Sequence, residues 1–134
     1  MSEAAVKKPR PKHLDLIAIR LPLPGIVSIL HRVSGAGLFL MLPVLLWLFG
    51  SSLASPESAA AAAACIANPF VKLVLFGLLW AYLHHFCAGI RFLFLDIHKG
   101  LDLPTARATS WAVLGVSLTL TVLIGAKLFL GGVI

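Results

Sequence analysis

Three long runs of apolar residues, separated by shorter polar segments, dominate the pattern along this chain. They cover approximately residues 26–50, 70–95 and 109–134. A helix that crosses the hydrocarbon core of a bilayer needs about 20 predominantly apolar residues, and each run is long enough. Because lipid offers the backbone no hydrogen-bond partners, such runs must cross as helices. The pattern predicts an all-α membrane protein with three transmembrane helices in one membrane-anchor domain, residues 1–134.

The segments outside these runs predict the connections. Residues 51–68 hold a proline, a glutamate and a run of six alanines, which predicts a short external loop that could form a surface helix. Residues 96–108 contain the helix breakers Gly100 and Pro104 and predict a loop on the other side of the membrane. Residues 1–25 are polar, basic and rich in proline, so we expect an irregular segment that lies along the membrane surface.

Composition narrows the class of protein. The chain is 60% apolar and 12% charged, with a mean hydropathy of +1.00. Soluble domains carry about 25% charged residues, and disordered chains lack apolar mass, so both classes are excluded. The two cysteines cannot form the disulfide framework of a small secreted scaffold.

The net charge is +6, and the distribution of the lysines and arginines along the chain predicts its orientation in the membrane. Nine of the eleven lysines and arginines lie on one predicted side of the membrane. By the positive-inside rule, the N-terminus and the loop 96–108 face the cytoplasm. The apolar bulk makes nucleic acid an unsuitable partner for this positive charge. The nine residues are Lys7, Lys8, Arg10, Lys12, Arg20, Arg32, Arg91, Lys99 and Arg107.

A first polar cluster stands at the start of the first span. Ser28, His31, Arg32 and Gly35 are spaced i, i+3, i+4 and i+7, so they share one face of a helix. Ionisable groups inside a span are costly, which makes each one a functional candidate. The alternative is structural: Arg32 reaches toward the headgroups, His31 lies among them, and Ser28 caps the helix or bonds to its own backbone.

A second polar cluster lies in the second span. A neutral imidazole at His85 can ligate iron, and Gly89, one turn later, leaves room for a flat macrocycle or another helix. The alternative for His85 is a hydrogen bond between helices, with glycine as a packing notch. Because His84 points about 100° away, we expect it to hydrogen-bond between helices. Arg91 and Asp96 could form a loose ion pair.

Other polar or small residues predict packing rather than chemistry. Ser117, Thr121 and Gly125 form a small-residue stripe on the third span, which is typical of close contact between helices. Cys65 and Cys87 fall in different environments, and we expect no disulfide between them.

Two motifs carry a resemblance to a known family. Residues 28–35 read Ser-Ile-Leu-His-Arg-Val-Ser-Gly, and residues 85–91 read His-Phe-Cys-Ala-Gly-Ile-Arg. Together with Arg-Pro-Lys-His-Leu-Asp-Leu at 10–16 and with Asp96, they resemble the cytochrome b membrane-anchor subunit of succinate dehydrogenase, of the proteobacterial type. The resemblance extends over most of the chain, including the three spans.

This resemblance implies heme b as the cofactor and ubiquinone as the substrate. It places His85 as an axial ligand of the heme iron, with His84 as the rival, and takes the second ligand from a partner subunit. It also places His31 and Arg32 near the heme propionates, and Ser28 and Arg32 in the quinone pocket. No residue of this chain is expected to be catalytic on its own.

The resemblance further implies three protein partners: a second small membrane anchor, an iron-sulfur subunit and a flavoprotein subunit, in the bacterial inner membrane. The chain departs from many relatives at Phe92, where they carry a further histidine. Two alternatives remain at this point, a heme-free structural anchor in which His85 and His31 only pack, and the anchor of a fumarate reductase. A small transporter would need an acidic residue in mid-membrane, and the spans contain none.

Overall fold

The computed structural model describes residues 19–130, and this part of the chain is built from helices without a strand. The predicted all-α class is confirmed, because α1, α3 and α4 are each long and apolar enough to cross a membrane. The surface segment predicted over residues 1–25 falls largely outside the described residues, as do residues 131–134 of the third span. The four helices are α1 (Leu23–Ala54), α2 (Pro56–Ala67), α3 (Pro69–Asp96) and α4 (Leu103–Leu130).

The segment between the first two spans forms the separate helix α2. The prediction that this segment is helical is confirmed, whereas its location at the membrane surface stays a prediction. Ser55 caps it: its side chain accepts from the backbone N–H of Ser58 at 3.2 Å, while the Ser58 hydroxyl accepts from the Ser55 N–H at 3.0 Å. This reciprocal capping box suits a helix rich in alanine, the strongest helix former. Asn68 ends α2 and caps α3 by accepting from the Phe70 N–H at 2.9 Å.

The connection between α3 and α4 is shorter than predicted. Gly100 has a φ of +75°, in the left-handed region that glycine adopts without strain. Pro104, however, lies in the first turn of α4 and not in the loop. A proline costs little there, because the first N–H groups of a helix have no partner within the helix. Asp102 accepts from the Thr105 N–H at 3.0 Å. Hydrogen bonds with the side chain and then the backbone of Thr105 hold the pKa of the Asp102 carboxyl below its usual range. The cap explains why α4 begins at Leu103 and not at 109.

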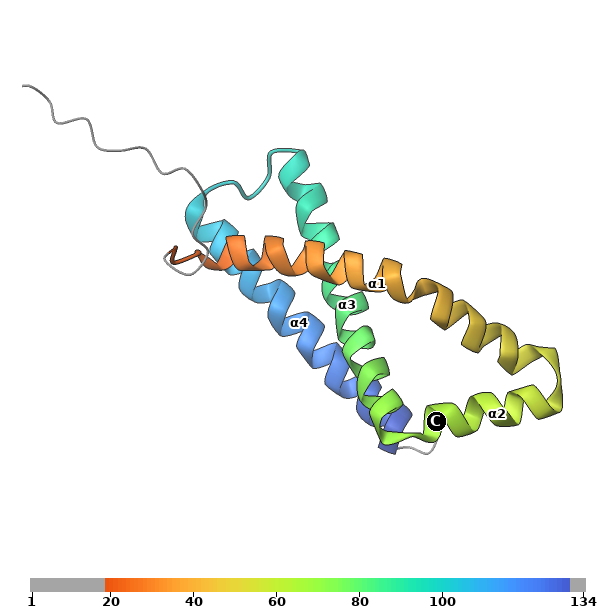
Figure 1. Ribbon diagram of the computed structural model, residues 1–134. Helices are drawn as coiled ribbons and strands as arrows, with labels where there is room; N and C mark the ends of the chain where they lie inside the picture. The colour runs from red at the N-terminus through yellow and green to blue at the C-terminus, as the bar shows by residue number, and fades with distance from the viewer. Residues whose placement is uncertain (1–18, 131–134) are drawn as a thin grey trace, which may run out of the picture.

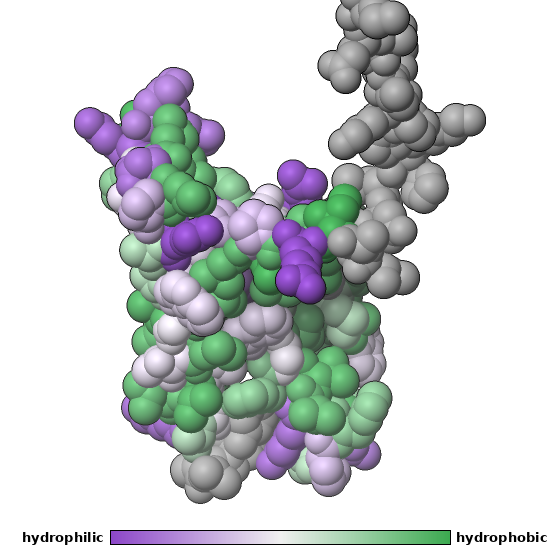
Figure 2. All heavy atoms as spheres, turned by 90° about the vertical axis from the view of Figure 1, so that its left-hand side faces the viewer, coloured by the Kyte–Doolittle hydropathy of each residue, from purple (hydrophilic) through white to green (hydrophobic). Residues whose placement is uncertain are grey.

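The three long helices cross one another, with α1 lying across α3 and α4 (Figure 1). Val27 on α1, Ala88 on α3 and Val113 on α4 form a buried cluster where the helices meet. The outer surface is largely hydrophobic, and hydrophilic side chains gather toward the ends of the molecule (Figure 2). Exposed aromatic residues such as Trp111, 66% exposed, are therefore suited to contact lipid or another protein.

The predicted packing stripe on α4 is confirmed. Ser117 and Thr121 are at most 2% exposed, and Gly125 is buried. The Thr121 hydroxyl donates to the Ser117 carbonyl of its own helix at 2.7 Å, so the stripe contributes close packing rather than a hydrogen bond between helices. A Cβ atom at Gly125 would collide with the ring of Phe76 on α3.

We therefore expect Gly125→Ala to destabilise the protein by about 1–3 kcal/mol, the usual cost of overpacking a well-filled core. Gly115→Ala is the matched control, since a Cβ atom there meets nothing within 4 Å. The measurement is the temperature at which half of the detergent-extracted protein leaves its monodisperse gel-filtration peak. Equal midpoints for the two variants would contradict the packing argument.

Candidate functional site

His85 points from α3 toward α1, where its ring is held by backbone and hydroxyl groups. Its Nδ1 lies 3.0 Å from the carbonyl oxygen of His31 and 3.3 Å from Ser34 Oγ. The Ser34 hydroxyl donates to the same carbonyl at 3.0 Å. Because a carbonyl only accepts, this geometry assigns the hydrogen to Nδ1, and Nε2 keeps its lone pair. Within residues 19–130, Nε2 has no hydrogen-bond partner. This tautomer is the one that ligates metals through Nε2.

The rings of His31 and His85 lie face to face. Their centroids are 4.1 Å apart with an interplanar angle of 12°. The ring of Phe92 lies on α3 at 5.0 Å from that of His31, tilted by 45°. The two predicted clusters are thus brought together through this pair of imidazoles, with Phe92 as a direct neighbour.

The absence of a side chain at Gly35 allows the His85 ring to pack directly against α1. A Cβ atom at Gly35 would lie 2.7 Å from Cε1 and 3.1 Å from Nδ1 of His85, closer than real contacts allow. At Gly89, a Cβ atom would lie 3.8 Å from Nε2 of His31, an ordinary contact. The sequence singled out Gly89 as the opening on α3, whereas the tighter requirement for glycine is on α1. The signal for it was the position of Gly35 one turn after His31.

His84 is fully buried and faces a different part of the bundle. Its exposed fraction is 0%, and its ring lies 5.3 Å from that of Trp80. It lies beside the backbone of Val27, but neither ring nitrogen has a hydrogen-bond partner among the described residues. The interhelical contact predicted for His84 is thus made with the Val27 backbone of α1, without a hydrogen bond of standard geometry.

The predicted ion pair of Arg91 with Asp96 is also absent from residues 19–130. Residues five apart on a helix point about 140° away from each other, so the two side chains diverge. Arg91 is 7% exposed and turns toward α4. Its Nε donates to Thr109 Oγ1 at 3.1 Å, and one terminal nitrogen lies 3.5 Å from the carbonyl oxygen of Ala106.

Ser28 and Arg32 are set apart from the histidine pair. Ser28 is half-buried and Arg32 is exposed. Neither side chain has a hydrogen bond or ion pair within the described part of the chain. Ser28 lies in the second turn of α1, so it does not cap the helix. On this face of α1, His31 and Gly35 therefore contact α3. Ser28 and Arg32 do not, and their polar groups are accessible to a molecule outside the chain.

Fold and site together define a small membrane subunit with three candidate spans and a pair of stacked imidazoles between α1 and α3. The chain belongs to the succinate dehydrogenase/fumarate reductase transmembrane subunit family, which its residues 6–124 match. This confirms the resemblance found in the two motifs.

Among its relatives is the succinate dehydrogenase cytochrome b556 subunit of Coxiella burnetii, 37% identical over 117 residues, or 87% of this chain and 94% of the relative. The subunits of the same name from Rickettsia felis and Paracoccus denitrificans are both 33% identical. They align over 88% and 85% of this chain, and over 90% and 88% of their own lengths. The relatives are cytochrome subunits, so the prediction of a membrane-anchor cytochrome subunit is confirmed at that level.

Proposed function

We propose that this chain binds heme b through Nε2 of His85 and anchors a succinate:ubiquinone oxidoreductase to the membrane. The observation that carries the proposal is the hydrogen bond from His85 Nδ1 to the His31 carbonyl, at 3.0 Å. It fixes the ring and increases the basicity of the opposite nitrogen, as is usual for histidines that ligate metals. The relatives named cytochrome b556 subunits support this assignment.

The residues present fit one axial position of a heme. No group of three or more histidine, cysteine or acidic side chains that could hold a metal occurs in residues 19–130. A porphyrin supplies four ring nitrogens, so its iron takes only axial ligands from protein. His85 supplies one, and a partner subunit supplies the other. His84 is the weaker candidate because its ring, 0% exposed, leaves no approach for a macrocycle.

The heme, when bound, supplies one-electron redox chemistry. The chain positions it through the His85 ring, which Ser34 and the His31 carbonyl hold in place. We assign His31 and Arg32 to the heme propionates, because Arg32 is an exposed cation one residue from the stacked imidazole of His31.

Ser28 and Arg32 form one wall of the proposed ubiquinone site. Their polar groups have no partner in the described part of the chain, so they are available to a ligand. Reduction of a quinone places negative charge on its carbonyl oxygens. A guanidinium and a hydroxyl that share one helix face can both donate hydrogen bonds to those oxygens and stabilise that charge.

The remaining parts of the enzyme belong to partners. We assign a second small membrane anchor, an iron-sulfur subunit and a flavoprotein subunit to the complex, in the bacterial inner membrane. The exposed aromatic side chains of α1 support this arrangement, since Phe39 and Trp47 are 74% and 65% exposed. Such a surface requires lipid or protein to cover it.

We expect Arg32→Leu to lower quinone reduction by the complex about 100-fold, and Ser28→Ala about 10-fold, because each removes a donor to the developing negative charge. Succinate oxidation with an artificial dye should stay unchanged, since that reaction does not need the quinone site. Arg20→Leu is the control, an exposed arginine just before α1. Unchanged quinone reduction in Arg32→Leu would contradict the assignment, and loss of both activities would indicate failed assembly.

One observation favours a second candidate, a structural anchor without heme. The stack of His31 on His85 and the bond to the carbonyl accommodate the imidazole without a metal. Reduced-minus-oxidised optical spectra of the purified complex separate the two functions. A b-type band supports heme binding, whereas its absence from a fully assembled complex supports the structural anchor.

A further inference from the structure

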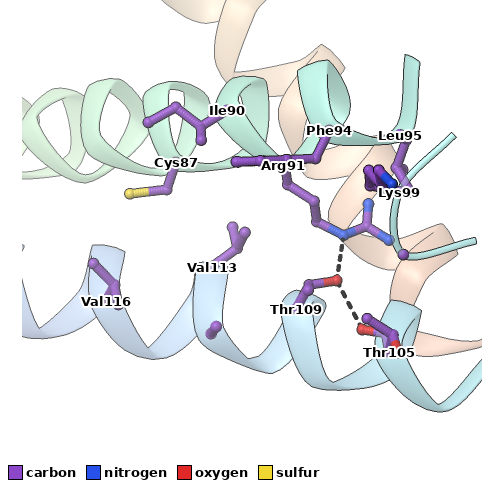
Figure 3. A pocket seen from close by; sticks show the side chains of 12 residues that line it. Cys87, Ile90, Arg91, Phe94, Leu95, Lys99, Thr105, Thr109, Val113 and Val116 are labelled. Atoms are coloured by element: carbon purple, nitrogen blue, oxygen red, sulfur yellow. Dashed lines mark hydrogen bonds between the residues drawn. The ribbon is translucent and has the colours of Figure 1, made fainter. Parts of the chain in front are cut away.

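A groove lies between α3 and α4 (Figure 3). Phe94 in its wall follows His85 by nine residues, which places it about 180° around the helix. The groove has a volume of about 510 Å³, within the range of about 300–1,000 Å³ typical of ligand sites. None of the residues assigned above to heme or quinone lines it.

The lining of the groove is divided along its length. The part away from the helix ends is apolar: Cys87 on α3 points toward α4, which contributes Val113 and Val116, and Ile90 also lines it (Figure 3). The end of the groove lies where α3 ends and α4 begins, and it carries two cations and two hydroxyls. These four residues are Arg91, Lys99, Thr105 and Thr109.

Within the described residues 19–130, the positive charge at this end has no acidic partner. Arg91 is 7% exposed, and its hydrogen bonds in this part of the chain go to the neutral acceptors Thr109 Oγ1 and the Ala106 carbonyl. Among residues 19–130, neither Arg91 nor Lys99 forms an ion pair. The Asp102 carboxylate binds the Thr105 N–H instead. A buried cation without a counter-ion is unfavourable, so this site favours an anion.

We propose that the groove binds an anionic phospholipid. The headgroup phosphate contacts Arg91 and Lys99. One acyl chain lies along the apolar part toward Val116. Arginine and lysine both bind phosphate, and arginine does so with paired donors of fixed geometry.

The position of each part favours lipid over other occupants. The cations lie where the spanning helices α3 and α4 meet the membrane edge, and the apolar part of the groove extends along α4 toward the bilayer. A phospholipid has the same arrangement, with a charged headgroup at the membrane edge and an apolar chain below it. A free phosphate would use the cations but not the apolar part. A partner helix would fill the apolar part but would leave the Arg91 charge without an anion.

The test is lipid binding by the purified, delipidated complex, measured by native mass spectrometry with phosphatidylglycerol or phosphatidylcholine. We expect the complex to bind phosphatidylglycerol about tenfold more tightly, because the quaternary ammonium of phosphatidylcholine would bring a further positive charge beside Arg91 and Lys99, whereas the glycerol headgroup is neutral. Arg91→Gln should remove this preference, because glutamine can still bond to Thr109 but carries no charge. Arg107→Gln, at an exposed residue that does not line the groove, is the control.

A second variant tests the groove without changing the charge. Ala112 lines the groove and is exposed, so Ala112→Trp should fill the apolar part and weaken binding of both lipids. Ala108→Trp is its matched control, because Ala108 is exposed and outside the lining.

The proposal is overturned if the complex binds both lipids equally, or if Arg91→Gln keeps the preference for phosphatidylglycerol. Loss of the partner subunits from Ala112→Trp alone would also overturn it, because the groove would then be a protein interface. If Arg91→Gln fails to assemble, the comparison of the two lipids and the Ala112→Trp variant decide.

Discussion

His85→Ala is expected to abolish the b-type absorbance band of the purified complex. Nε2 of His85 has no hydrogen-bond partner within residues 19–130, and its Nδ1 is held 3.0 Å from the His31 carbonyl oxygen. Removing the ring removes one proposed axial ligand, and the neighbouring His84 cannot replace it, because it points about 100° away and is fully buried. The measurement is the reduced-minus-oxidised spectrum, normalised to the amount of complex.

His84→Leu is the matched comparison. Both ring nitrogens of His84 are buried without a hydrogen-bond partner among the described residues. Replacing such a group by an apolar one of similar size removes a desolvation cost, so we expect no loss of stability and an unchanged band. A band that survives His85→Ala, or one that is lost only in His84→Leu, would contradict the ligand assignment.

The hydropathy pattern was sufficient to predict the three spanning helices but not where α4 begins. Apolar runs report how much of a helix lies in hydrocarbon. The first turn of α4 lies outside that run, and its start depends on the hydrogen bond between Asp102 and Thr105, with Pro104 placed where a helix accepts it. A hydropathy average over an apolar run does not detect such a cap, because the cap depends on hydrogen bonds of individual polar residues.

The sequence singled out the residues of the candidate site, but it did not predict their contacts. Spacing on α1 placed Ser28, His31, Arg32 and Gly35 on one face, yet only His31 and Gly35 meet the His85 ring. Which part of a face meets a neighbour depends on how the two helices are rotated and crossed, which a single sequence does not contain. The roles of Ser34 and Phe92 were missed for this reason, since both depend on the distance between α1 and α3.

Gly35→Ala is expected to weaken heme binding about 10–100-fold, the usual effect of disturbing a group that orients a metal ligand. The new Cβ atom would lie 2.7 Å from Cε1 of His85, so either the ring or α1 must move. Gly37→Ala is the control on the same helix, because a Cβ atom there meets nothing within 4 Å. Heme content per complex, measured for both variants, checks the prediction.

A double-mutant cycle measured by thermal stability tests the clash between the new methyl group at position 35 and the His85 ring separately from heme binding. If the clash with the imidazole is what destabilises Gly35→Ala, the substitution should cost about 1–3 kcal/mol in the wild-type background and much less in the His85→Ala background, where the ring is gone. Residues in contact couple in this way, whereas independent residues give additive effects. Additive effects would mean that Gly35 matters for another reason, such as contact with a partner subunit, and that the His85 ring does not rest on α1.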